Sequence, residues 1–200
     1  MGAQAAFAFA NSERFKRLSR RQRDRLEGLS KLDEFAEGQV ILVAGRHSES
    51  VYLIASGAVD VRVKTRSGDL TIAQLQPGDL FGELERFAKM PEGVRHIART
   101  RTVVRAIAKN PLRHEVLVHR EMASGLLAAY GRSISEKLRA ANDVAVRLGR
   151  RPELLPRIDS DAFTRALRMN FSVAFRVLES LCSVLGEAYR DTILDIIAKA

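Results

Sequence analysis

The stretch QPGDLFGEL, residues 76–84, holds the most informative local pattern of the chain. The Pro-Gly pair at 77–78 predicts a tight turn, and the Leu-Phe pair at 80–81 continues as a short strand. Gly82 interrupts that strand, which indicates a close approach of the backbone to another segment. The stretch therefore predicts a turn, a short strand and a backbone break directly before the acidic residue Glu83.

The composition is that of a globular chain with a basic surface. The 200 residues are 46% hydrophobic, which is enough to bury a core. The formal net charge of +9 favours an anionic partner such as nucleic acid, acidic lipid or a phosphorylated small molecule. Residues 151–200 contain seven basic and seven acidic side chains, so the whole positive excess lies in residues 1–150.

The N-terminal part predicts short amphipathic helices over residues 12–30, with Ser12 and Ser19 as N-cap residues. Seven basic residues lie between Arg14 and Arg25, against only Asp24 within that stretch and Glu13 just before it. This basic face is either an ordinary solvated surface or a surface for RNA or lipid phosphates.

Between residues 35 and 108 the pattern changes to short runs rich in Val and Ile, separated by turn signals. The alternation over 59–63 places three valines on one face, as in a half-solvated antiparallel strand. Many closely spaced strands predict a barrel or a sandwich. The expected strands are 39–43, 50–55, 58–64, 70–75, 79–81 and 102–108.

From Asn110 onward the chain is predicted to be helical, with Asn110 as N-cap, Pro111 as first helical residue and a stop at Gly149. A last helical pair is expected from about residue 160 to 197. A shift of 51 residues aligns the apolar stripe of 122–139 with that of 173–190. This alignment is either an internal duplication or the similarity of any two amphipathic helices.

The sequence offers no sign of an enzyme or a metal site. The single Cys182 cannot form an internal disulfide and is expected to pack as a small hydrophobic residue. His47 and His96 lack partners at a catalytic spacing, and no Cys/His cluster has zinc spacing. No targeting signal and no membrane-spanning run are present, so we expect a cytoplasmic protein.

Glu83 has two readings from the local sequence alone. A short helix that begins at the Gly-rich turn would present free backbone N–H groups to a phosphate, and Glu83 could accept a ribose hydroxyl beside it. Alternatively, Glu83 is only an acidic residue in the first turn of that helix, where the helix dipole favours it.

Residues 35–108, with the following helix through Ala141, resemble the cyclic nucleotide-binding domain of catabolite activators and protein-kinase regulatory subunits. The resemblance rests on FAEGQVILVAG at 35–45, SVYLIASGAVDV at 50–61, LQPGDLFGEL at 75–84 and the following Pro91. It implies an α+β fold: an eight-stranded antiparallel β jelly-roll with short N-terminal helices and a helical C-terminal region. We expect an N-terminal helical segment at 1–30, the β-roll with its long helix at 31–148, and a C-terminal helical subdomain at 149–200.

The resemblance also implies a ligand site. In this family the phosphate-binding cassette is the segment between two late strands of the barrel, and the Gly and Glu of FGEL within it bind the ribose-phosphate. An Arg directly after the Pro of this cassette contacts the cyclic phosphate. The chain departs from that pattern because Glu92 follows the Pro. Arg95 is the preferred replacement, ahead of Arg86 or Lys89, although it could equally be an ordinary strand-face charge. The expected ligand-binding residues are Phe81, Gly82, Glu83, Leu84, Arg95 and His96.

Two functions follow from the resemblance. The first is a regulatory sensor that binds cyclic AMP or cyclic GMP, with no further cofactor, and passes binding to its C-terminal helices. The alternative is a ligand-free, degenerate domain that serves as a protein–protein interaction or assembly module. Either form implies a homodimer or a protein partner through the C-terminal helices. Residues 151–200 are neutral and show no winged helix, so we expect no DNA partner, and we expect no membrane partner.

Overall fold

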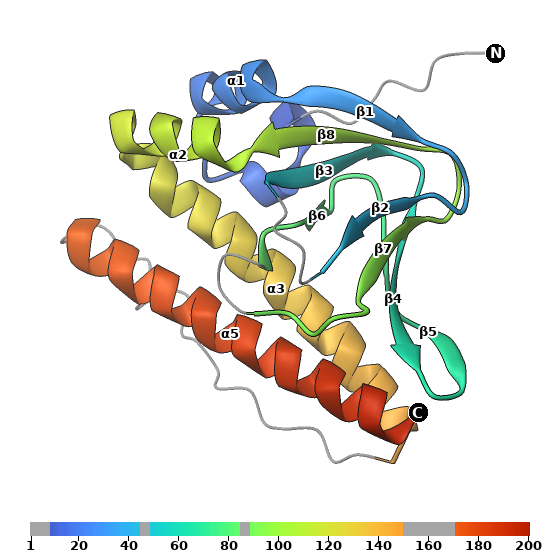
Figure 1. The fold of residues 1–200 in the computed structure, drawn as a ribbon. Coiled ribbons are helices and arrows are strands. Elements are labelled where there is room, and N and C mark those ends of the chain that lie inside the picture. The colour runs from blue at the N-terminus through green and yellow to red at the C-terminus, as the bar shows by residue number, and fades with distance from the viewer. Residues whose placement is uncertain (1–8, 45–48, 85–88, 150–170) are drawn as a thin grey trace.

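The computed structural model describes residues 9–44, 49–84, 89–149 and 171–200. Two four-stranded sheets form the body of the molecule, and long helices lie along one side of it (Figure 1). Before the first strand come two 3-10 turns, η1 (Phe9–Asn11) and η2 (Glu13–Phe15), and the helix α1 (Arg20–Leu29). The predicted α+β jelly-roll with eight antiparallel strands is confirmed.

All strand pairs are antiparallel. The strand order is β1-β8-β3-β6 in one sheet and β2-β7-β4-β5 in the other. The strand runs predicted from the sequence pattern lacked two strands: that at 31–35, which is mostly polar and exposed on an edge, and that at 95–98. The first sheet contains β1 (Lys31–Phe35), β8 (Thr102–Ala108), β3 (Ser50–Ser56) and β6 (Leu80–Phe81). The second contains β2 (Val40–Val43), β7 (Arg95–Ala98), β4 (Val59–Thr65) and β5 (Gly68–Leu75).

The break that the sequence places at Gly82 has a clear structural cause. Gly82 has a φ of +84°, which is in the left-handed region. A Cβ atom at this position would lie 2.8 Å from the carbonyl oxygen of Ser50 and 3.1 Å from the ring of Tyr52. Glycine is therefore required both by the backbone conformation and by the close approach of β3, and it directs the chain away from β6 at Glu83.

The single helix predicted between Asn110 and Gly149 is divided into two helices, α2 (Lys109–Val118) and α3 (Glu121–Arg147). The predicted N-cap at Asn110 is wrong: the N-cap is Ala108, because the last β8 residue passes directly into the helix without a capping side chain. The stop at Gly149 is confirmed, since this glycine has a φ of +84° just beyond the helix end.

The last helix, α5 (Phe171–Lys199), lies along α3 (Figure 1). Cys182 Sγ lies 3.8 Å from the carbonyl oxygen of Leu127, and Thr192 Oγ1 lies 3.3 Å from Asn142 Oδ1. The two helices are therefore parallel, with sequence offsets of 55 (182 − 127) and 50 (192 − 142). These offsets are close to the shift of 51 that aligns the two apolar stripes. The expected helix near residue 160 lies outside the described residues.

One hydrophobic core connects all of these parts. It contains the N-terminal Phe9 and Phe15, the interior of the barrel and the facing sides of α3 and α5. Ser19 is confirmed as the N-cap of α1 with a full capping box, whereas Ser12 precedes η2 without a side-chain cap bond. Among the described residues, no helix is both long and apolar enough to cross a bilayer.

Candidate functional site

Glu83 is the centre of the candidate site. It follows β6 and is only 1% exposed, and its Oε1 atom accepts a hydrogen bond of 2.8 Å from Ser133 Oγ. The same oxygen forms an ion pair with the ammonium group of Lys137. Glu83 Oε2 is buried and has no hydrogen-bond partner among the described residues. One carboxylate oxygen is thus fully engaged by the protein itself.

Both partners of Glu83 come from α3. Ser133 and Lys137 are one helical turn apart and face the barrel, and each residue is 3% exposed. Ser133 Oγ also lies 3.3 Å from the carbonyl oxygen of Leu80, so its hydroxyl proton is shared between two acceptors. These contacts fasten the middle of α3 to the end of β6.

An aromatic stack fills the barrel interior next to this ion pair. The ring centroids of Tyr52 and Phe81 are 4.8 Å apart, and those of Phe81 and His96 are 5.0 Å apart. Burial, followed by the nearby charge of Lys137, lowers the pKa of His96 to about 3. His96 is therefore neutral at physiological pH, and its Nδ1 atom has no hydrogen-bond partner among the described residues.

Arg95 lies on the face of β7 opposite to that of His96. In the register of β7 with β4, Arg95 lies opposite Arg62, whereas His96 lies opposite Val61, which is fully buried inside the barrel. Because successive side chains of a strand point to opposite faces, Arg95 lies on the outer face of the sheet. There it forms an ion pair with Asp69. The structure therefore separates Arg95 from Glu83, although it brings His96 close to the Glu83 partner Lys137.

The remaining expected site residues also have defined places. Phe81 and Leu84 are buried in the core, and Gly82 lies against β3. Glu92, at the usual position of the family arginine, is exposed, as is Lys89. Arg86 lies outside the described residues.

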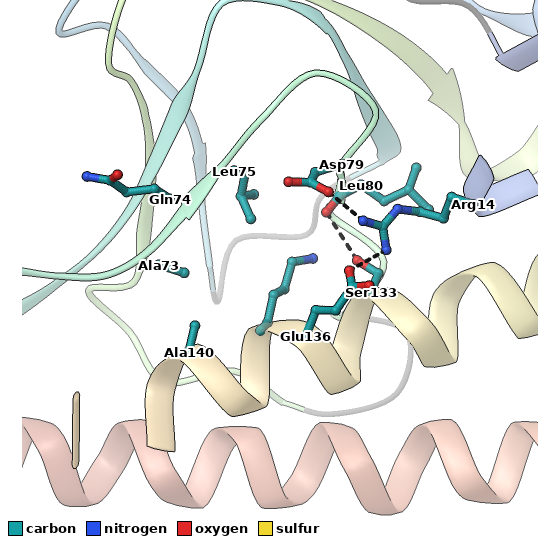
Figure 2. Close-up of a pocket in the computed structure, with 10 residues that line it drawn as sticks. Arg14, Ala73, Gln74, Leu75, Asp79, Leu80, Ser133, Glu136 and Ala140 are labelled. Carbon is teal, nitrogen blue, oxygen red and sulfur yellow. Dashed lines mark hydrogen bonds and ion pairs between the residues drawn. The ribbon is translucent and has the colours of Figure 1, made fainter. Parts of the chain in front are cut away.

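A small pocket lies beside Ser133 and Lys137, between α3 and the turn that leads into β6. Figure 2 shows Arg14 reaching across it toward Asp79 and Glu136. Arg14 pairs with Asp79, lies 2.7 Å from Glu136 Oε2 and donates to the carbonyl oxygen of Gly78 at 3.2 Å. The cavity volume is about 90 Å³, well below the roughly 300–1,000 Å³ of typical small-molecule sites.

Ser133 and Lys137 were not among the site residues predicted from the sequence. Each lies next to an apolar residue of the α3 stripe, Ile134 or Leu138, on the buried side of the helix. The available signal was this pair of polar residues at i and i+4 within a stripe that faces the core. Only the fold shows that Glu83 lies opposite them.

These features define a jelly-roll domain in which the acidic residue after a short strand packs against a long helix that follows the barrel. The family model described as cyclic nucleotide-binding domain matches residues 32–117, and this part of the chain is a domain of that family. Domains of this family are typically regulatory and not catalytic.

The chain is 28% identical over 109 residues to a cAMP-dependent protein kinase regulatory subunit of Mycosarcoma maydis. This match covers 54% of the chain but only 19% of the relative, so the chain spans about a fifth of that protein.

Solved structures show the same fold. A cyclic nucleotide-binding domain from Methylobacillus flagellatus matches with a TM-score of 0.59 and 18% identity, covering 70% of this chain and 77% of that one. The Thermus thermophilus catabolite activator protein matches with a TM-score of 0.54 and 20% identity, covering 92% and 85% of the two chains. At these identities the likeness concerns the fold alone.

Proposed function

We propose that this protein is a regulatory module whose cyclic nucleotide-binding domain works without a nucleotide, as a protein–protein interaction or assembly unit. The observation that carries the proposal is the state of Glu83. The carboxylate that the family uses for the ribose is buried and already bound by Ser133 and Lys137 of α3. The protein's own helix thus supplies the hydrogen-bond donors that a ligand would offer.

The positions of the charged residues that were expected near a cyclic phosphate support the same proposal. Arg95, the preferred substitute for the family arginine, lies on the outer face of the sheet with Asp69. Glu92 brings negative charge to the position where the family has its arginine. A cyclic phosphate would meet no free cation from either residue, and a missing phosphate contact costs about 1–3 kcal/mol.

The sensor function is the second candidate, favoured by one observation. Gly82 and Glu83 retain the family residues, and Gly82 has the backbone conformation that only glycine adopts easily. A ligand would have to displace Lys137 from Glu83. Breaking such a buried pair costs about 3 kcal/mol, which would weaken binding roughly a hundredfold.

The interaction surface would not be the apolar stripe of α3. Leu127, Tyr130, Ile134 and Leu138 are all buried within the chain, between the barrel and α5. The outward positions of α3 carry mostly charged residues: Arg132, Glu136, Arg139 and Asp143. A homodimer or partner that uses the C-terminal helices would therefore contact the outer side of α5 or this charged side of α3.

The test is a calorimetric titration of the folded protein with cyclic AMP, cyclic GMP and cyclic dinucleotides, paired with thermal-shift measurements. We expect no binding heat and no change in melting temperature with any of them. Lys137→Met should be measured in parallel, because it removes the competing ammonium group from Glu83.

Each outcome discriminates between the two functions. No binding by either the native protein or the Lys137→Met protein supports the ligand-free module. Micromolar binding by the native protein that Glu83→Ala abolishes would overturn it. Binding that appears only in the Lys137→Met protein would show that the module is closed by Lys137 and not by the missing arginine. Circular dichroism of each variant confirms that it is folded.

A further inference from the structure

The helices α1 and α2 form an antiparallel pair at one end of the barrel (Figure 1). Lys31 of β1 lies opposite Ala106 of β8, α1 ends just before β1, and α2 begins just after β8. The last turn of α1 is thus beside the first turn of α2, and the two helices run away from this point together. An ion pair of 3.0 Å between Arg25 and Glu115 joins their middles.

The far ends of the two helices carry exposed cations. Arg20 and Arg21 begin α1, and Arg120 lies two residues after the end of α2, as the N-cap of α3. All three side chains are exposed, and none forms an ion pair with a residue that the structure describes. Their charged groups are therefore directed to solvent, with the exposed acidic residues Asp24, one turn along α1, and Glu121, next to Arg120, as neighbours.

Two exposed aliphatic residues lie at the same end. Leu117 is 61% exposed and Val118 is 59% exposed, which is more than any other large hydrophobic residue of the described chain. Adjacent exposed aliphatic side chains surrounded by charge are typical of a surface that contacts a partner or a membrane. We call this end, formed by Arg20, Arg21, Leu117, Val118 and Arg120, the α1–α2 tip.

We propose that the α1–α2 tip binds an anionic lipid surface. The arginines match the phosphates of acidic headgroups, and the aliphatic pair can enter the boundary of the acyl chains. The tip is the protruding end of a helix pair (Figure 1), a shape that a soft bilayer admits without a matching cavity. Nucleic acid would pair with the arginines but would leave Leu117 and Val118 in water.

The charge of the whole chain acts in the same direction. A net charge of +9 attracts the protein toward an anionic surface over the Debye length, and the tip then fixes its orientation. Such contact stays at the membrane surface and needs no spanning helix. This proposal replaces the expectation of no membrane partner, which rested only on the absence of targeting signals and spanning segments. The proposal is also independent of whether Glu83 is paired with Lys137 or with a ligand.

The test uses the full chain and sedimentation with two kinds of vesicle: pure phosphatidylcholine, and phosphatidylcholine with about one third phosphatidylglycerol. We expect binding to the anionic vesicles only, and loss of that binding in high salt. The double variant Arg20→Glu, Arg21→Glu should bind at least tenfold more weakly. The double variant Leu117→Ser, Val118→Ser should also bind more weakly, although its charge is unchanged.

Matched controls are available elsewhere on the surface. Arg139→Glu with Arg147→Glu changes the net charge equally on α3, and Val184→Ser with Leu194→Ser removes two exposed aliphatic residues from α5. Both controls should bind anionic vesicles as the native protein does. Absence of vesicle binding, or equal weakening by a control and its matched tip variant, would overturn the proposal. Tighter binding to duplex DNA or polyglutamate than to the vesicles would exclude lipid as the occupant.

Discussion

At the scale of single residues, the buried ion pair between Glu83 and Lys137 is the most consequential contact. Two charges have been removed from water, and they compensate each other only while both are present. Ser133 adds a hydrogen bond to the same oxygen. The pair therefore makes the position of α3 dependent on the end of β6, and this dependence can be measured.

The energetic effects of removing Glu83 and Lys137 should not be additive. We expect Glu83→Leu and Lys137→Met each to lower the free energy of unfolding by about 3 kcal/mol, because each leaves a buried charge without its partner. The double variant should lose less than the sum of the two. Urea unfolding of all four proteins measures the coupling, and additive losses would show that the two side chains act independently.

His96 should make the stability depend on pH. Its pKa is about 3 in the folded protein, below the ordinary value of 6.5, so the unfolded chain binds the proton more readily. Stability is then complete above about pH 6.5 and is lost as the pH falls toward 3. Between about pH 7 and pH 5 the loss from this group should be about 2 kcal/mol.

Urea unfolding at the two pH values measures this loss. His96→Phe keeps the ring stack without a titratable group and should reduce the pH dependence, whereas the exposed His114→Gln should leave it unchanged. An unchanged pH dependence in the His96→Phe protein would contradict the assignment.

At the scale of elements, α3 is in contact with the N-terminal turns, the barrel and α5. Gly125 and Gly131 show how differently these surroundings constrain it. A Cβ atom at Gly125 would lie 2.3 Å from Leu18 Cδ2, which is buried, whereas one at Gly131 would lie 3.7 Å from Cys182 Sγ. Only the first position requires glycine for close packing.

Alanine substitutions at these two glycines form a matched pair within one helix. Gly131→Ala should stabilise the protein by up to about 1 kcal/mol, because alanine favours the helix. Gly125→Ala gains the same propensity but must displace Leu18, so we expect a net loss of about 1 kcal/mol. Thermal and urea unfolding measure the stability of both variants. Equal changes in stability would show that the N-terminal turns move away from α3 at little cost.

At the scale of the whole molecule, one core extends from Phe9 through the barrel to Ile196. The parallel packing of α5 on α3 closes this core on one side, and Ser67 of the β4–β5 hairpin donates to the carbonyl oxygen of Ala200 at 2.5 Å. The molecule should therefore unfold as one cooperative unit.

The thiol of Cys182 reports on this cooperativity. It is 1% exposed between α5 and α3, so it should react with a thiol reagent only after α5 detaches. We expect its reactivity to rise at the same urea concentration at which the circular dichroism signal of the fold is lost. Rapid reaction in the absence of urea would show that α5 opens separately from the barrel.

Local sequence patterns predicted most of the secondary structure of this protein. The alternating valines of β4, the turn at 77–78 and the break at Gly82 follow from side-chain period and backbone sterics, which act over a few residues. The resemblance to the cyclic nucleotide-binding family predicted the jelly-roll arrangement of the strands. The first strand β1 was missed because its polar, exposed edge residues show no alternation.

The contacts of the site residues, in contrast, depend on how distant parts of the chain pack together. Glu83 and Lys137 are 54 positions apart, and no local pattern indicates that α3 crosses the end of β6. Arg95 is adjacent to His96 in sequence, yet the register of β7 against β4 places it on the outer face. Burial, pairing and access to a ligand depend on long-range packing, which the periodicity of a sequence does not encode.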